Sequence, residues 1–104
     1  MSSLIGCWRL VTASADLGLA GEDEMQFKDE ENLIYAVDAG NKWQLMLLTY
    51  RIDGEEIVSN QPSQPRYERS AFRFTDSGEL VMKYKNGEAV FRRIPHLTID
   101  ELQA

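Results

Sequence analysis

Cysteine, proline and long apolar runs are nearly absent from this chain of 104 residues. The single cysteine, Cys7, excludes an internal disulfide framework and is typical of a reducing compartment, so we expect a cytoplasmic protein. No apolar segment approaches the roughly 18 residues that a membrane-spanning helix requires. The start, Met1-Ser2-Ser3, lacks the basic and apolar regions of a secretory signal. The sequence therefore predicts a soluble globular protein with no membrane partner.

Residue patterns for catalysis and metal binding are also scarce. The one histidine, His96, follows a proline and has no candidate nucleophile beside it, and Cys7 has no histidine partner in the pattern. The acidic runs 22–24 and 29–31 lack the spacing and central glycine of a calcium loop, so we interpret them as solvated loops. A glycine-rich phosphate loop is missing as well. We expect no enzyme, no metal and no cofactor.

Positive charge is in the minority, because the net charge is -6. This balance disfavours nucleic acid and anionic membranes as partners. The charge is also uneven: residues 1–60 hold 11 acidic and 4 basic side chains, whereas residues 66–93 hold 7 basic and 4 acidic ones. The basic stretch is either a solvated surface of balanced strand pairs or a patch for an anionic group.

What the chain does contain is a series of short apolar segments separated by turn signals, within a single domain spanning residues 1–104. The segments span residues 4–11, 24–28, 33–37, 42–52, 55–59, 67–74, 80–85 and 89–94. This spacing predicts an all-β, antiparallel up-and-down meander of about eight strands, which can close into a barrel and remove its edges. A Thr-x-x-Glu box at 98–101 predicts a short C-terminal helical turn.

The turn at 53–54 is an Asp-Gly hairpin signal. Counting back from it pairs Ile52 with Glu55 and Arg51 with Glu56, and the second pair is expected to face water. The apolar face of this hairpin is then formed by Leu48, Tyr50, Ile52 and Ile57.

Two further turns, at 76–78 and 86–87, predict registers that agree with each other. The first pairs Phe74 with Leu80, and the second pairs Leu80 with Arg93. The residues predicted to face inward are Phe72, Phe74, Leu80, Met82, Tyr84 and Phe91. Those predicted to face outward are Arg69, Arg73, Lys83, Lys85 and Arg92.

The first and last strands carry a family resemblance. Gly6 and Trp8 form a Gly-x-Trp motif on the opening strand, and Arg93 lies on the last strand. In this layout the chain resembles the lipocalin-like (calycin) barrels. The resemblance implies that the terminal strands lie side by side and that Arg93 stacks on the Trp8 indole to close one end. Arg92 takes this role if a bulge shifts the strand's phase.

The resemblance also implies a small apolar or amphipathic ligand inside the barrel. An eight-stranded barrel is just wide enough to be filled by its own side chains or to hold one small molecule, and both alternatives stay open. The polar residues at inward positions, which are the candidate ligand contacts, are Tyr50, Ser59, Glu68, Ser70 and Tyr84. An alternative in which Glu68 and Tyr84 act as an enzyme requires that the two share a cleft.

A second function class is a protein-interaction module, similar to small barrel-shaped protease inhibitors, which would act through the exposed loop 61–66. A homodimer is a related possibility, because Trp43, Leu45 and Leu47 are apolar and lie on the face opposite Leu48. A bulge near Met46 would turn these side chains inward; otherwise they form an exposed stripe.

Overall fold

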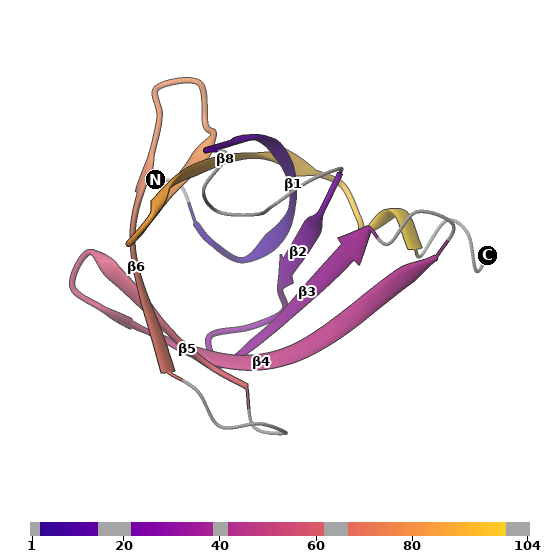
Figure 1. The fold of residues 1–104 in the computed structure, drawn as a ribbon, viewed down its shortest axis with the longest axis horizontal. Coiled ribbons are helices and arrows are strands. Elements are labelled where there is room, and N and C mark those ends of the chain that lie inside the picture. The colour runs from indigo at the N-terminus through magenta and orange to yellow at the C-terminus, as the bar shows by residue number, and fades with distance from the viewer. Residues whose placement is uncertain (1–2, 15–21, 39–41, 62–66, 100–104) are drawn as a thin grey trace.

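Eight antiparallel strands follow one another around a closed barrel in a computed structural model that describes residues 3–14, 22–38, 42–61 and 67–99 (Figure 1). The strands are β1 (Gly6–Ala13), β2 (Glu24–Phe27), β3 (Asn32–Asp38), β4 (Trp43–Asp53), β5 (Glu56–Asn60), β6 (Tyr67–Phe74), β7 (Leu80–Tyr84) and β8 (Gly87–Ile94). Each strand pairs with its neighbours in sequence, and β8 returns to pair with β1. The predicted all-β meander barrel is confirmed.

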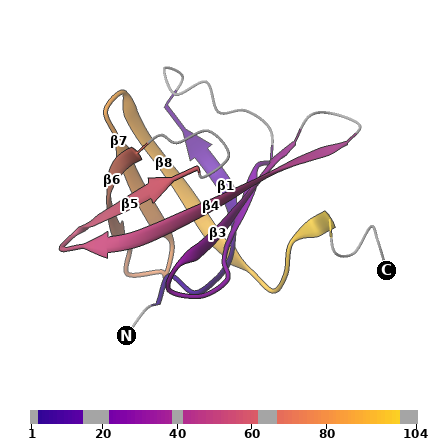
Figure 2. The same ribbon diagram turned by 90° about the horizontal axis from the view of Figure 1, so that it is seen from below.

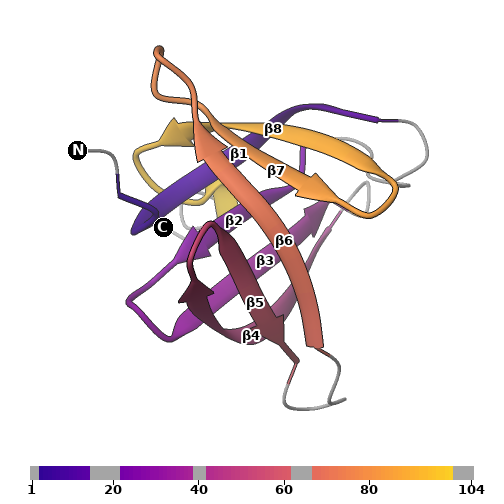
Figure 3. The same cartoon turned by 90° about the vertical axis from the view of Figure 1, so that its left-hand side faces the viewer.

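The ring is closed by β1 and β8, which lie side by side in Figure 3. Trp8 is directly opposite Arg93, so the predicted meeting of the terminal strands is confirmed and Arg93 rather than Arg92 faces the indole. The register shifts between Leu10 and Thr12, where β1 carries a bulge. Because the bulge lies beyond Trp8, it leaves the pairing at this end of the strands intact.

Two of the three predicted hairpin registers were wrong by two residues. In the β4–β5 hairpin Ile52 pairs with Ile57, and Arg51 is opposite Val58 instead of Glu56. The turn is therefore Gly54-Glu55, with φ of 64° at Gly54. A glycine with positive φ at the first central position is what a type II′ turn requires, whereas the predicted type I′ turn would also have needed positive φ at the aspartate.

The β7–β8 hairpin shows the same kind of shift, while β6–β7 does not. Tyr84 pairs with Gly87 around a Lys85-Asn86 turn, and Leu80 lies opposite Phe91 instead of Arg93. Across the β6–β7 turn the predicted pairs hold, including Phe72 with Met82 and Phe74 with Leu80. A two-residue shift keeps every side chain on the same face, so the predicted inward face survived both errors.

The middle of the barrel is filled by a core of buried apolar side chains. Its largest fully buried apolar side chains, each at 2% exposure or less, are Trp8, Met25, Phe27, Ile57, Leu80 and Phe91. Phe27 meets Tyr50 edge-on, with 4.9 Å between ring centroids. This layer therefore joins residues from β1, β2, β5, β7 and β8 across the inside of the barrel.

The segment after β8 covers part of the outer surface, and Figure 2 shows it leaving the barrel beyond that strand. Leu97 is 3% exposed, and the backbone N–H of Thr98 donates to Glu24 Oε1 at 2.7 Å. The acidic run at 22–24 is thus no solvated loop, because Asp23 and Glu24 are both buried. Of the predicted C-terminal turn, residues 100–104 lie outside the described part of the chain.

The long strand β4 contains no bulge. Its pairing with β3 is uninterrupted, from Trp43 opposite Asp38 to Thr49 opposite Asn32. Leu45 and Leu47 are consequently 48% and 66% exposed, and the expected bulge near Met46 was wrong. The alternative, an exposed apolar stripe on the outer face, is the one that the structure shows.

Candidate functional site

The barrel has a hollow at each end of its packed middle. The first, which we term the mouth cavity, has a volume of about 710 Å³ and opens between the ends of β5, β6 and β7 near Asn86. The second, the hairpin-end hollow, has a volume of about 570 Å³ and lies near the β4–β5 and β6–β7 turns. The two linings share no residue, so they are separate candidate sites.

Apolar side chains form most of the mouth cavity's wall. They come from β2, β3, β4, β5 and β7, at alternate positions where a strand contributes two, because alternate residues of a strand face the same side. The apolar and aromatic lining residues are Met25, Leu33, Tyr35, Met46, Leu48, Ile57, Met82 and Tyr84. Methionines on three different strands give this wall adaptable packing, since their unbranched side chains fill irregular gaps.

Polar groups converge on one side of this apolar wall. Four of the five predicted ligand contacts are here: Ser59 on β5, Glu68 and Ser70 on β6, and Tyr84 on β7. Ser70 is buried and Glu68 lies nearer the opening. Sequence alternation alone had placed these residues on one face, and closure of the barrel brings them to one cavity. Their role in binding stays a prediction.

Tyr84 and Glu68 are electrostatically coupled within this group. Burial, with the negative charge of Glu68 as a second cause, raises the pKa of Tyr84 to about 12. The Tyr84 hydroxyl also approaches Met82 Sδ at 3.6 Å, which is a weak contact. The phenol is therefore protonated at neutral pH and is equipped to donate a hydrogen bond rather than to accept a proton.

Tyr35 belongs to the cavity but was not predicted to do so. Its hydroxyl donates to Asp23 Oδ2 at 3.4 Å, and the N–H of Asp38 donates to Asp23 Oδ1 at 3.0 Å. Burial, and then the Asp23 charge, raise the pKa of Tyr35. Tyr35 was missed because both faces of residues 33–37 are apolar, so the sequence pattern could not show which side chains point inward. Asp23 was missed because no local pattern marks it as buried.

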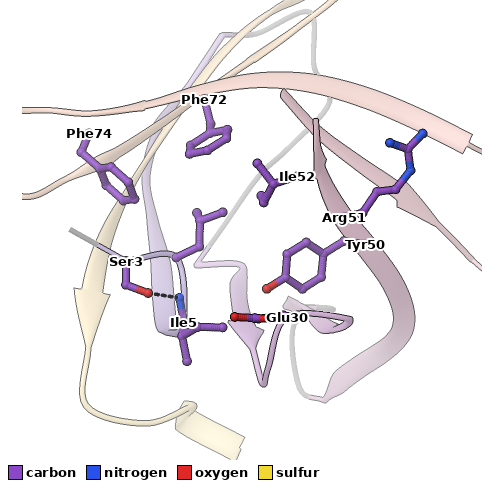
Figure 4. Close-up of a pocket in the computed structure, with 9 residues that line it drawn as sticks. Ser3, Ile5, Glu30, Tyr50, Arg51, Ile52, Phe72 and Phe74 are labelled. Carbon is purple, nitrogen blue, oxygen red and sulfur yellow. Dashed lines mark hydrogen bonds between the residues drawn. The ribbon is translucent and has the colours of Figure 1, made fainter. Parts of the chain in front are cut away.

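The remaining predicted contact, Tyr50, lies at the opposite end of the barrel. It lines the hairpin-end hollow together with Ile52, Phe72 and Phe74 (Figure 4). Its hydroxyl donates to the backbone oxygen of Asp29. Burial, followed by the nearby acidic charges, raises the pKa of Tyr50. The structure thus separates Tyr50 from the four other candidates.

The Trp8–Arg93 pair closes the barrel beside this hollow. Arg93 Cζ is 4.2 Å from the centroid of the Trp8 ring, and its guanidinium donates to Ile5 O at 2.9 Å and Ser3 O at 2.5 Å. Gly6 has a φ of 130°, which L side chains rarely adopt, and a Cβ there would also come within 2.5 Å of Arg93 Nη1, so glycine is favoured at this position. All three residues of the Gly-x-Trp and arginine motif act in closure.

Other site types find no support among the described ranges. No cluster of three or more His, Cys, Asp or Glu side chains in these ranges is arranged to hold a metal ion. No helix in the described part of the chain has the length and apolarity to cross a bilayer. The loop predicted as an inhibitor-like contact, 61–66, is described only at Gln61, which borders the mouth cavity.

Comparison of the chain with protein-family models, with curated proteins and with solved structures found no match.

Proposed function

We propose that this protein is a lipocalin-like barrel that binds a small apolar or amphipathic molecule in its mouth cavity without transforming it. The observation that carries the proposal is the cavity itself, with an apolar wall and a polar group at one side. Its volume of about 710 Å³ falls in the range of small-molecule sites, roughly 300–1,000 Å³.

The lining indicates the character of the molecule. An apolar body fits against Met25, Ile57 and Met82, where removal from water contributes about 25 cal/mol per Å² buried. Near the opening, Glu68 offers an acceptor and Tyr84 a donor. We therefore expect a ligand with an apolar body and one polar end that accepts a hydrogen bond from Tyr84 or donates one to Glu68.

The same pair argues against catalysis. Glu68 and Tyr84 share the cavity, as the enzyme alternative required. A general acid or base works best with a pKa near the operating pH, whereas that of Tyr84 is raised to about 12. The phenol then positions a ligand by hydrogen bonding and has little tendency to exchange protons with it.

The test is a titration with N-phenyl-1-naphthylamine, an apolar probe that becomes fluorescent when it leaves water. We expect saturable binding at one site in the wild type. Ser59→Trp places an indole in the cavity and should weaken binding at least tenfold. Saturable binding that is unchanged by Ser59→Trp would show that the probe sits elsewhere and would overturn the proposal.

The matched control is Lys83→Trp. Lys83 lies on β7 between the cavity residues Met82 and Tyr84, but it is exposed on the outer face. The indole added there does not enter the cavity, so the affinity for the probe should stay within about twofold of the wild type.

A further inference from the structure

Half of β4 has a strand on only one side. On its β3 side the strand is paired from Trp43 through Thr49, but its pairing with β5 covers only Thr49–Asp53. Figure 1 shows the first half of β4 continuing past the end of β5. Among the described residues no strand pairs with the β5 side of Trp43–Leu48, which we call the open edge.

The backbone direction along this edge follows from one hydrogen bond. The N–H of Tyr50 donates to Glu31 O on the β3 side at 2.9 Å. Peptide groups point alternately to the two sides of a strand, so every second residue back from Tyr50 also bonds toward β3. Trp43, Leu45 and Leu47 therefore direct their N–H and C=O groups out of the open edge.

The side chains give this edge no protection against pairing. No charged residue and no proline occurs between Trp43 and Thr49. Lysines, prolines, bulges or short length normally prevent exposed edges from joining other chains. Leu45 and Leu47 are instead 48% and 66% exposed, next to the partly exposed Ile34 of β3. An unpaired backbone and an apolar surface thus coincide.

We propose that the open edge pairs with the same edge of a second copy of this chain, antiparallel, about a two-fold axis at Leu45. In this register Leu45 faces its own twin, and Trp43 faces Leu47 of the second copy. Each of these opposed residues exchanges two N–H···O bonds with its partner. The strands of the two barrels then form one continuous sheet.

The dimensions of the edge favour a second copy as the occupant. The open edge ends where Thr49 pairs with Asn60 of β5. An antiparallel second copy centred on Leu45 needs only residues 43–47 and therefore does not meet β5. The paired stretch carries no charged side chain between Trp43 and Thr49, so two copies of a chain with net charge -6 meet here without opposing like charges.

Disulfide trapping tests the register. Opposed residues in a hydrogen-bonded antiparallel pair have Cα atoms about 5.5 Å apart, within the range of about 4.4–6.8 Å for disulfides. Leu45→Cys should therefore give a covalent dimer under mild oxidation. The control, Leu47→Cys, is on the same exposed face, but its twin lies about 14 Å away at roughly 3.4 Å per residue, so it should crosslink at least tenfold more slowly. Equal crosslinking of both variants would overturn the pairing.

Light scattering after size exclusion tests the dimer without any crosslink. We expect the wild type to be dimeric and Leu45→Lys to raise the dissociation constant at least tenfold, because two lysines would meet at the axis. Val11→Lys changes an exposed apolar residue of β1 and should leave the dimer intact. A monomeric wild type at the concentrations used for trapping would overturn the proposal. This result would not affect the proposed ligand, whose cavity lies within one copy.

Discussion

The guanidinium of Arg93 connects the last strand, β8, to the first strand and to the segment that precedes it. Arg93 stacks on Trp8 and donates to two backbone oxygens of the segment before β1, those of Ser3 and Ile5. Trp8 in turn donates from Nε1 to Leu4 O at 3.0 Å. The segment that precedes the barrel is therefore held by residues from both terminal strands, and its Leu4 is buried as a result.

Arg93→Ala should lower the free energy of unfolding by about 2 kcal/mol. A cation–π contact contributes roughly 0.5–2 kcal/mol, and each hydrogen bond about 1 kcal/mol. The measurement is urea unfolding followed by tryptophan fluorescence. Arg93→Lys should recover less than half of the loss, because an ammonium cannot reproduce the planar stack and the two directed donors.

Arg92→Ala is the matched control, because Arg92 is adjacent, exposed and on the other face of β8. We expect a change within about 0.5 kcal/mol, as is usual for surface substitutions. Equal effects of the two substitutions would show that Arg93 does not close the barrel.

At the scale of the element, the segment 95–99 is held to the sheet by a buried carboxylate. Glu24 is fully buried and accepts from Arg9 Nε at 2.9 Å and from the Thr98 hydroxyl at 2.5 Å, and its Oε2 forms an ion pair with Arg9 Nη2 at 2.8 Å. Arg9 Nη2 also donates to Thr98 Oγ1 at 2.6 Å, so three side chains from β1, β2 and the final segment satisfy one another. A fully satisfied network of this kind fixes one docking position for the segment.

Glu24→Ala should lower the free energy of unfolding by about 3 kcal/mol, because removal of one partner leaves a half-buried charge on Arg9 without its counter-ion. Equilibrium unfolding in urea measures the loss. The control is Glu22→Ala, two residues earlier and exposed, for which we expect about 0.5 kcal/mol or less. A similar small loss for Glu24→Ala would mean that the segment is not held through this carboxylate.

At the scale of the whole molecule, the barrel is filled in its middle and hollow at its ends. The sequence had left a filled interior and a usable pocket as alternatives, and the structure combines them along one axis. The packed layer supplies stability, whereas the ends can hold polar groups near water. Tyrosines at both ends nevertheless carry a raised pKa, because burial and then nearby acidic charges disfavour their ionised form.

These tyrosines make the whole fold sensitive to alkali. The pKa of Tyr84 is about 12 when folded and about 10 when unfolded, so the unfolded chain loses its proton first. Stability from this group is complete below pH 10 and is lost as pH rises from 10 to 12. Between pH 9 and 11 we expect Tyr84 to account for a loss of about 1 kcal/mol in the free energy of unfolding.

Urea unfolding at pH 9 and pH 11 checks this expectation. Tyr84→Phe should reduce the loss between the two pH values, while Tyr67→Phe, a change at an exposed residue, should leave it as in the wild type. An identical alkaline loss in wild type and Tyr84→Phe would show that the phenol of Tyr84 does not ionise differently in the two states.

Alternation along the strands was sufficient to predict the meander and most of the candidate site. Ser59, Glu68, Ser70 and Tyr84 could be assigned to one face because side chains alternate with a period of two. This assignment tolerated the errors at Gly54 and the β7–β8 turn, since a shift of two residues leaves the face unchanged. The Gly-x-Trp pattern and the arginine on the last strand also located the closing pair, Trp8 and Arg93.

Only the tertiary structure decided which residues meet across the chain and where strands end. Glu24 is buried because Thr98, 74 positions later, bonds to it, and no local pattern contains that contact. Likewise, the open edge of β4 exists because β5 ends at Asn60, which the apolar run of β4 could not reveal. Sequence pattern determines which face a residue takes, because backbone geometry is local; burial and pairing depend on partners that folding brings from elsewhere.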